Sequence, residues 1–168
     1  MTPAQLLEII DDAVIYLAKN GGPLVSDEAR TLLLAIALQE SGPLLAARYQ
    51  NAPSASPGPA RGFWQFEKIG VQGVLQHKSA GAVVNGICAN LEVISNTDTV
   101  WRTIEGHDRL ACIVARMLLW TDPKPLPTKP SDGWDYYVRN WRPGKPHKDA
   151  WANNWRIATE TVGTKAKT

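Results

Sequence analysis

The segment from Ser26 to Gly42 constrains the fold more than any other, because an apolar helical pattern in it ends in an acid. Ser26 is a favourable N-cap, and the two acids that follow it interact well with the helix dipole. One stripe at i, i+3 and i+4 spacing is apolar: Ala29, Leu32, Leu33, Ile36 and Ala37. Glu40 takes the next position of this stripe. The pattern therefore predicts a core-facing helix with one carboxyl group in its last turn.

Helical patterns also dominate the rest of the chain. They predict helices over residues 3–19, 68–77, 79–91, 98–104, 107–120, 133–141 and 147–161, with Thr97 or Asp98 capping the fourth and Ser131 or Asp132 the sixth. Three prolines predict an irregular loop over residues 51–61, although a short β-hairpin within residues 43–62 is left open. We expect a mostly α fold, one domain over residues 1–162, and a flexible tail over residues 163–168.

The charge of the chain is small but unevenly distributed. A length of 168 residues suffices for one domain with a sizeable core, and the net charge of +2 does not by itself indicate nucleic acid. Residues 121–168 carry nine Lys and Arg against five Asp and Glu, a net +4, which leaves −2 for residues 1–120. A basic C-terminal part suits an anionic polymer. No nucleic-acid-binding signature is visible, so we do not expect nucleic acid as a partner.

Cysteine and histidine indicate no cofactor. Cys88 and Cys112 lie in apolar helical patterns, which predicts two buried free thiols, although a disulfide is left open. The three histidines lack metal-ligand spacing, so no metal is expected. The first residues lack the basic and apolar regions of a signal peptide, and no apolar run reaches the roughly 18 residues of a transmembrane helix.

A carboxyl group at the position of Glu40 is poorly placed to ionise. Burial and the negative end of the helix dipole both disfavour the charged form and raise the pKa of a Glu side chain. A raised pKa is what a general acid near neutral pH requires. Two alternatives are left open: Glu40 faces solvent beyond the helix end, or it pairs with Arg48 or Arg61.

The segment G-F-W-Q-F-E, residues 62–67, places three aromatic side chains beside an amide. An exposed ring next to a Gln suits a sugar, because the ring stacks on the apolar face while the amide binds hydroxyl groups. The alternative is a core anchor in which Phe63, Trp64 and Phe66 are all buried.

The helix ending in A-L-Q-E-S-G, followed some twenty residues later by G-F-W-Q, resembles the lytic transglycosylase and goose-type lysozyme group. Glu40 and Ser41 match the Glu-Ser motif of the group, and Gly62 and Gln65 match the ends of its Gly-Leu-Met-Gln segment. The resemblance implies a lysozyme-like helical fold and cleavage of the β-1,4 bond between N-acetylmuramic acid and N-acetylglucosamine in peptidoglycan. Glu40 would be the catalytic acid, and Ser41, Trp64 and Gln65 would position the substrate or the acid.

Three further positions bear on the resemblance. Glu67 stands where goose-type lysozymes carry an acid that positions water, although it also suits a helix N-terminus. If its carboxyl group lies about 6.5–9.5 Å from that of Glu40, an inverting hydrolysis is expected; otherwise the C6 hydroxyl of the sugar attacks C1 and leaves a 1,6-anhydro product. Tyr137 matches a late Tyr-Val pair whose Tyr reaches the catalytic acid, or else it is a packing aromatic. The Ala-Tyr-Asn motif of the group is absent, and residues 115–122 are the nearest candidate.

The C-terminal part interleaves aromatic and basic side chains, among them Trp134, Trp141, Trp151 and Trp155. They either pack onto the helices or edge a glycan groove in which cations meet carboxylates of peptidoglycan.

The resemblance, together with the missing signal peptide, implies a bacteriophage endolysin or virion component. It would be found in the host cytoplasm with later access to the wall, or in the virion, and its partners would be the glycan strand and other virion proteins. A chitinase-like hydrolase and a catalytically silent virion or scaffolding protein are the alternatives.

Overall fold

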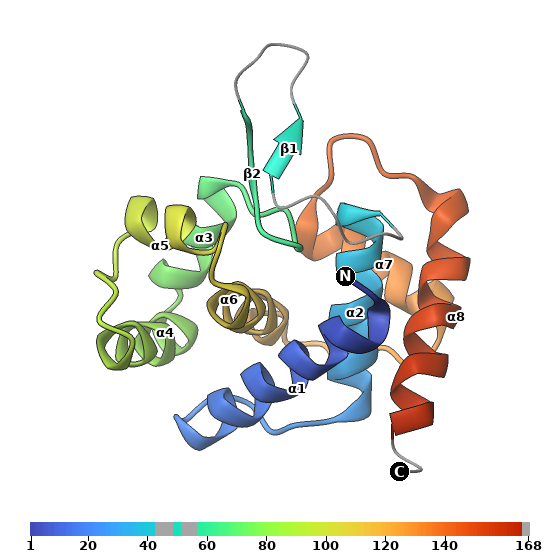
Figure 1. The fold of residues 1–168 in the computed structure, drawn as a ribbon, viewed down its shortest axis with the longest axis horizontal. Helices are drawn as coiled ribbons and strands as arrows, with labels where there is room; N and C mark the ends of the chain where they lie inside the picture. Colours follow the sequence, from blue (N-terminus) through green and yellow to red (C-terminus); the bar gives the residue numbers. More distant parts are fainter. Residues whose placement is uncertain (43–48, 52–56, 166–168) are drawn as a thin grey trace.

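The computed structural model describes residues 1–42, 49–51 and 57–165 (Figure 1). This part of the chain contains eight helices and two short strands: α1 Pro3–Lys19, α2 Asp27–Ser41, β1 Tyr49–Asn51, β2 Pro57–Arg61, α3 Lys68–Gln76, α4 Lys78–Asn90, α5 Thr97–Thr103, α6 Asp108–Thr121, α7 Pro130–Trp141 and α8 Lys148–Lys165. The predicted mostly α class is confirmed. The strands pair antiparallel where a hairpin was left open. The predicted irregular loop is wrong over residues 57–61, which form β2, because proline is tolerated in an edge strand. Residues 52–56 of that loop lie outside the described residues.

Helices α2 and α6 form the centre of the core. Residues 31–38 of α2 and residues 110–117 of α6 are all buried. Helix α2 is therefore buried on all sides and not only along the predicted stripe, because α1, α6 and α8 all pack against it (Figure 1). Its C-terminal end, which carries Glu40, is consequently held in a fixed place.

The predicted N-caps of α1 and α2 are confirmed: the side chains of Thr2 and Ser26 each accept a backbone N–H in the first turn of the helix. Two predicted caps are wrong. The N-cap of α5 is Asn96 and not Thr97 or Asp98, because the side-chain oxygen of Asn96 accepts the N–H of Thr99. Helix α7 begins at Pro130, since proline fits the first helical position and needs no N–H partner.

The C-terminal helix is longer than predicted. Helix α8 continues to Lys165, three residues beyond the expected domain end, while residues 166–168 lie outside the described residues. The ammonium group of Lys165 lies 2.7 Å from the Asp11 carboxylate of α1. This ion pair ties the last turn of α8 to the body of the protein.

The two thiols are buried and free, as predicted. Burial raises the pKa of both Cys88 and Cys112 well above that of an exposed thiol. Among the described residues, no helix is both long enough and apolar enough to cross a membrane.

Candidate active site

Glu40 lies half-buried in the last turn of α2. Its Oε1 accepts a hydrogen bond of 2.7 Å from the hydroxyl group of Tyr137. Burial raises the pKa of Glu40 to about 7, and the hydrogen bond from Tyr137 opposes this rise. Glu40 is thus not a solvent-facing charge. Arg61 pairs with Glu105 at 2.7 Å, and Arg48 lies outside the described residues.

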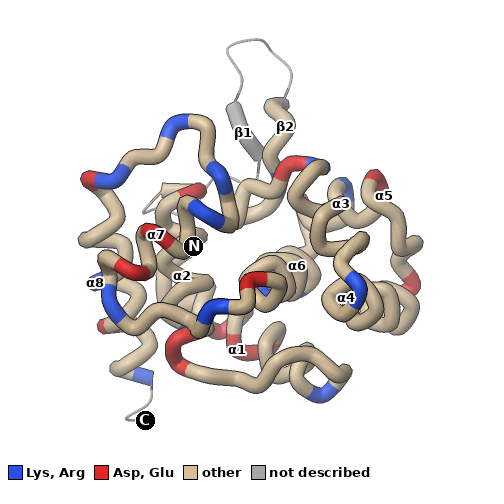
Figure 2. Tube along the Cα trace, turned by 180° about the vertical axis from the view of Figure 1, so that it is seen from behind, with Lys and Arg blue, Asp and Glu red and all other residues tan. Residues whose placement is uncertain are grey.

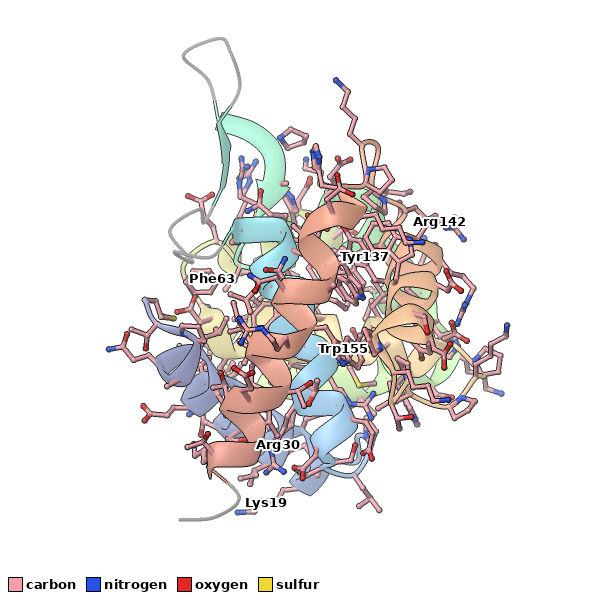
Figure 3. The ribbon with its side chains drawn as sticks, turned by 90° about the vertical axis from the view of Figure 1, so that its right-hand side faces the viewer. Lys19, Arg30, Phe63, Tyr137, Arg142 and Trp155 are labelled. Atoms are coloured by element: carbon pink, nitrogen blue, oxygen red, sulfur yellow. The ribbon has the colours of Figure 1, made fainter. Side chains whose placement is uncertain are left out.

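Tyr137 reaches Glu40 from the aromatic cluster between α7 and α8 (Figure 3). Its ring is buried and stacks on Trp151, with centroids 5.2 Å apart and planes at 15°. The ring of Trp134 packs against it in a tilted arrangement, with centroids 5.5 Å apart and planes at 51°. Both interpretations of Tyr137 therefore hold: the ring packs in the core, and this packing directs the hydroxyl group at the carboxyl group of Glu40.

Residues 62–65 form a tight turn beside the end of α2. The N–H of Gln65 donates to the Gly62 carbonyl oxygen at 3.0 Å, and Gly62 has φ +70°. A Cβ atom at Gly62 would lie 2.9 Å from the carbonyl oxygen of Ile104, so glycine is needed for space as well as for backbone conformation. Gln65 also has positive φ, +49°.

The sequence-based role of Trp64 as a substrate contact is wrong for its side chain. Trp64 is completely buried, and its Nε1–H donates to the Leu33 carbonyl oxygen of α2 at 2.9 Å. Phe63 and Phe66 are buried as well, so the core-anchor alternative describes all three rings. The rings are covered because the turn lies directly on the central helices. Trp64 instead holds the turn against the helix that carries Glu40.

Ser41 and Gln65 connect the two predicted motifs. The Ser41 hydroxyl group donates to the Phe63 carbonyl oxygen at 2.6 Å, which joins the end of α2 to the turn. The Gln65 side chain donates to the carbonyl oxygen of its own turn, at Gly62, at 2.8 Å. Ser41 thus holds the turn of residues 62–65 against the end of α2, while Gln65 lies half-buried in the wall of the adjoining cleft.

A cleft of about 920 Å³ opens at Glu40. Its lining comes from α2, α3, the end of α6, α7 and the segment before α8, and includes Glu40, Gln65, Glu67, Leu118, Thr121, Asn140 and Trp141. Glu67 is exposed there and makes no side-chain capping bond at the start of α3. The structure therefore brings Glu40, Gln65 and Glu67 to one cleft and places Ser41, Trp64 and Tyr137 behind its wall.

The end of α6, where the sequence offered the nearest candidate for the Ala-Tyr-Asn motif, forms part of the cleft wall. It contributes Leu118 and Thr121, so this wall lacks the Tyr and Asn of the group. Next to it, the buried Asp122 carboxylate accepts from Arg139 Nη2 at 2.7 Å and from Asn140 Nδ2 at 2.9 Å. These bonds fix the start of the connection between α6 and α7.

The four C-terminal tryptophans lie in two kinds of environment, the packed core and the cleft. Trp134, Trp151 and Trp155 are buried packing residues. Trp141 lines the cleft, and its Nε1–H donates to the Trp64 carbonyl oxygen at 3.0 Å. Periodicity cannot separate them, because their different environments arise only when α7 and α8 pack together.

Gln39 is a site residue that sequence reasoning missed. Its Nε2–H donates to the His147 carbonyl oxygen at 2.9 Å, and its Oε1 accepts from the buried Asn154 at 2.9 Å. These partners lie more than a hundred residues away in the chain, so no local pattern indicates them.

The fold and the site define a mostly helical protein with a half-buried carboxyl group at one cleft. In residues 1–42, 49–51 and 57–165, no group of three or more His, Cys, Asp or Glu side chains could hold a metal ion. Comparison with protein-family models, curated proteins and solved structures found no match. The likeness to the lytic transglycosylase and goose-type lysozyme group therefore rests on the two sequence motifs.

Glu40→Gln is expected to stabilise the protein at pH 8 and to leave its stability nearly unchanged at pH 4. The pKa of Glu40 is raised from 4.5 to about 7 by folding, so the unfolded chain loses this proton first as the pH rises. The ionised carboxyl group then lowers the free energy of unfolding, by on the order of 3 kcal/mol above pH 7. Urea unfolding of both proteins at pH 4, 6 and 8 measures the difference. A difference that does not change with pH would contradict the raised pKa.

Tyr137→Phe is expected to raise the pKa of Glu40 further, by about one pH unit. The phenol donates to the carboxylate and favours its ionised form, and a hydrogen bond to a charged group contributes roughly 1.5–3 kcal/mol. The phenylalanine ring keeps the packing on Trp151. A carbon-13 NMR titration of the Glu40 carboxyl group measures the pKa in both proteins. An unchanged or lowered pKa would show that the hydroxyl group does not stabilise the carboxylate.

Proposed function

We propose that this protein cleaves the β-1,4 bond between N-acetylmuramic acid and N-acetylglucosamine in peptidoglycan, with Glu40 as general acid. One observation carries the proposal. The acid of the Glu-Ser motif is a half-buried carboxyl group with a pKa of about 7, in a cleft that also presents Gln65 of the second motif. A carboxyl group with this pKa is protonated in a large fraction of molecules at neutral pH and is able to donate that proton.

The first chemical step is the same for both expected outcomes. Protonated Glu40 gives its proton to the glycosidic oxygen as the bond from this oxygen to C1 breaks, and positive charge develops on the sugar ring. The hydroxyl group of Tyr137 donates to the carboxylate that remains. This donation stabilises the ionised form and keeps the carboxylate in place for the second step.

The second step distinguishes a hydrolase from a transglycosylase. In the hydrolase, Glu67 takes a proton from water as the water attacks C1, which requires the two carboxyl groups to lie about 6.5–9.5 Å apart. In the transglycosylase, the C6 hydroxyl group of the same sugar attacks C1 and gives its proton to Glu40. The exposed carboxyl group of Glu67 in the same cleft supports the first route.

Digestion of purified peptidoglycan tests the proposal and identifies the route. Mass spectrometry of the released fragments would show 1,6-anhydro ends from a transglycosylase and reducing ends from a hydrolase. Cleavage of chitin oligomers without cleavage of peptidoglycan would indicate the chitinase-like alternative. Failure to release fragments from either polymer would favour a silent virion or scaffolding module, which the Leu118 and Thr121 wall supports because it lacks the Tyr and Asn of the group.

Glu67→Gln is expected to abolish most fragment release only if the wild-type products carry reducing ends. In that case the amide cannot accept the proton of the attacking water, and the rate should fall about 10²–10⁴-fold. Glu92→Gln is the matched control, because Glu92 is also exposed but lies outside the cleft. A Glu67→Gln protein that still produces reducing ends at the wild-type rate would refute the role of Glu67.

A further inference from the structure

The segment from Arg142 to His147, here termed the cationic lip, forms one edge of the cleft. It is fixed at both ends. At its start, Trp141 donates to the Trp64 carbonyl oxygen at 3.0 Å, and Arg142 adopts a left-handed backbone with φ +48°. At its end, the His147 carbonyl oxygen accepts from Gln39 at 2.9 Å. The lip is thus tied to both motif segments, next to Glu40 and next to Gln65.

The lip carries positive charge that the described part of the protein does not neutralise. Within residues 1–42, 49–51 and 57–165, Arg142 and Lys145 are exposed and have no carboxylate at salt-bridge distance. The nearby Arg139, in contrast, pairs with Asp122 at 2.7 Å. No acid occurs in the sequence between Asp135 and Asp149. Figure 2 shows Lys and Arg along the segment that joins α7 to α8.

The wall contributed by α3 differs from the lip. Ile69, Gly70 and Gly73 line the cleft there without charge, and Ile69 is 72% exposed. Glu67, at the start of α3, is the acid on this side. The cleft is therefore asymmetric, with cations along one edge and a largely uncharged wall from α3. A strand bound between them would meet positive charge along one edge.

We propose that Arg142 and Lys145 determine specificity by binding carboxylates on the glycan strand, so that the protein prefers an acidic glycan to a neutral one of the same sugar backbone. The inference rests on the proposed function, because it takes the strand to lie in the cleft. The guanidinium group of Arg142 presents a planar set of N–H donors that matches a carboxylate, and Lys145 adds a point charge. Since the ends of the lip are already fixed, little ordering of its backbone opposes binding.

Binding to two forms of one polymer tests this preference. Native peptidoglycan is compared with peptidoglycan whose carboxylates have been converted to amides, using a Glu40→Gln protein that leaves the polymer uncut. The double substitution R142Q/K145Q in this background is expected to weaken binding to the native polymer about three- to tenfold, the range for two exposed ion pairs. Binding to the amidated polymer should not change. Lys78→Gln with Lys124→Gln is the control, since it removes the same charge at exposed positions outside the cleft.

Three results would overturn the inference. They are no measurable binding to native peptidoglycan, equal affinity of the Glu40→Gln protein for both polymers, or a loss of affinity in R142Q/K145Q that is equal for both polymers. Thermal unfolding of each variant shows whether a loss reflects folding. Cleavage by the protein with Glu40 intact is measured separately. Selective binding to the native polymer without cleavage would refute the proposed function but support the role of the cationic lip. Cleavage with equal affinity for both polymers would refute only the proposed role of the lip.

Discussion

Glu40→Gln is expected to lower the rate of peptidoglycan cleavage by a factor of about 10²–10⁴, the usual contribution of a positioned general acid. The amide has nearly the shape of the carboxyl group, and its oxygen can accept the same hydrogen bond from Tyr137. It has no proton to give to the glycosidic oxygen. The substitution therefore removes the chemistry while keeping the local structure, and the rate of fragment release at pH 6 measures the effect.

Two controls separate this loss from other causes. Glu40→Gln should be at least as stable as the wild type, because the neutral amide removes the energetic cost of an ionised group at a half-buried position. Its binding to peptidoglycan should persist. A variant that folds, binds and cleaves at the wild-type rate would show that another group supplies the proton.

Trp64→Ala is expected to lower the free energy of unfolding by about 3–5 kcal/mol, the range for removing a large buried aromatic side chain. The Trp64 side chain is completely buried and makes a 2.9 Å hydrogen bond to the Leu33 carbonyl oxygen. Its loss would leave a cavity and remove a hydrogen bond to α2. Because whole domains are stable by only about 5–15 kcal/mol, this single change should shift the urea unfolding midpoint strongly.

Trp120→Ala is the matched control for this experiment. Trp120 is 38% exposed on α6, so its removal leaves a smaller void and the loss of stability should be clearly smaller. Equal losses for the two variants would contradict the role of Trp64 as the anchor of residues 62–65 on α2. Loss of peptidoglycan cleavage in Trp64→Ala at a temperature where it remains folded would further show that this anchor positions the cleft wall.

The helices and the position of Glu40 could be predicted because their signals are local. Apolar spacing places Glu40 on the core-facing stripe of α2, and the caps at Thr2 and Ser26 depend on neighbouring residues only. The burial of Trp64 could not be predicted in the same way. An aromatic side chain in a tight turn can be exposed to solvent or buried in the core. Which of the two holds for Trp64 depends on the packing of the turn against Leu33.

Contacts between distant segments account for the remaining differences. The Gln39 bonds to His147 and Asn154 join parts of the chain that have no common pattern. The ion pair of Lys165 with Asp11 joins α1 to the part of α8 that lies beyond the predicted end of the domain. Each depends on how whole helices pack, and periodicity within one helix carries no information about that packing.

The pH dependence of fragment release, measured with wild type and Glu40→Gln between pH 5 and 9, tests the central claim most directly. If Glu40 donates the proton, the wild-type rate falls about tenfold per unit above a pH near 7, because the acid must be protonated to act. The Glu40→Gln protein should show only background release at every pH. Wild-type release that is undiminished at pH 9, or equal release by the two proteins, would contradict Glu40 as the general acid.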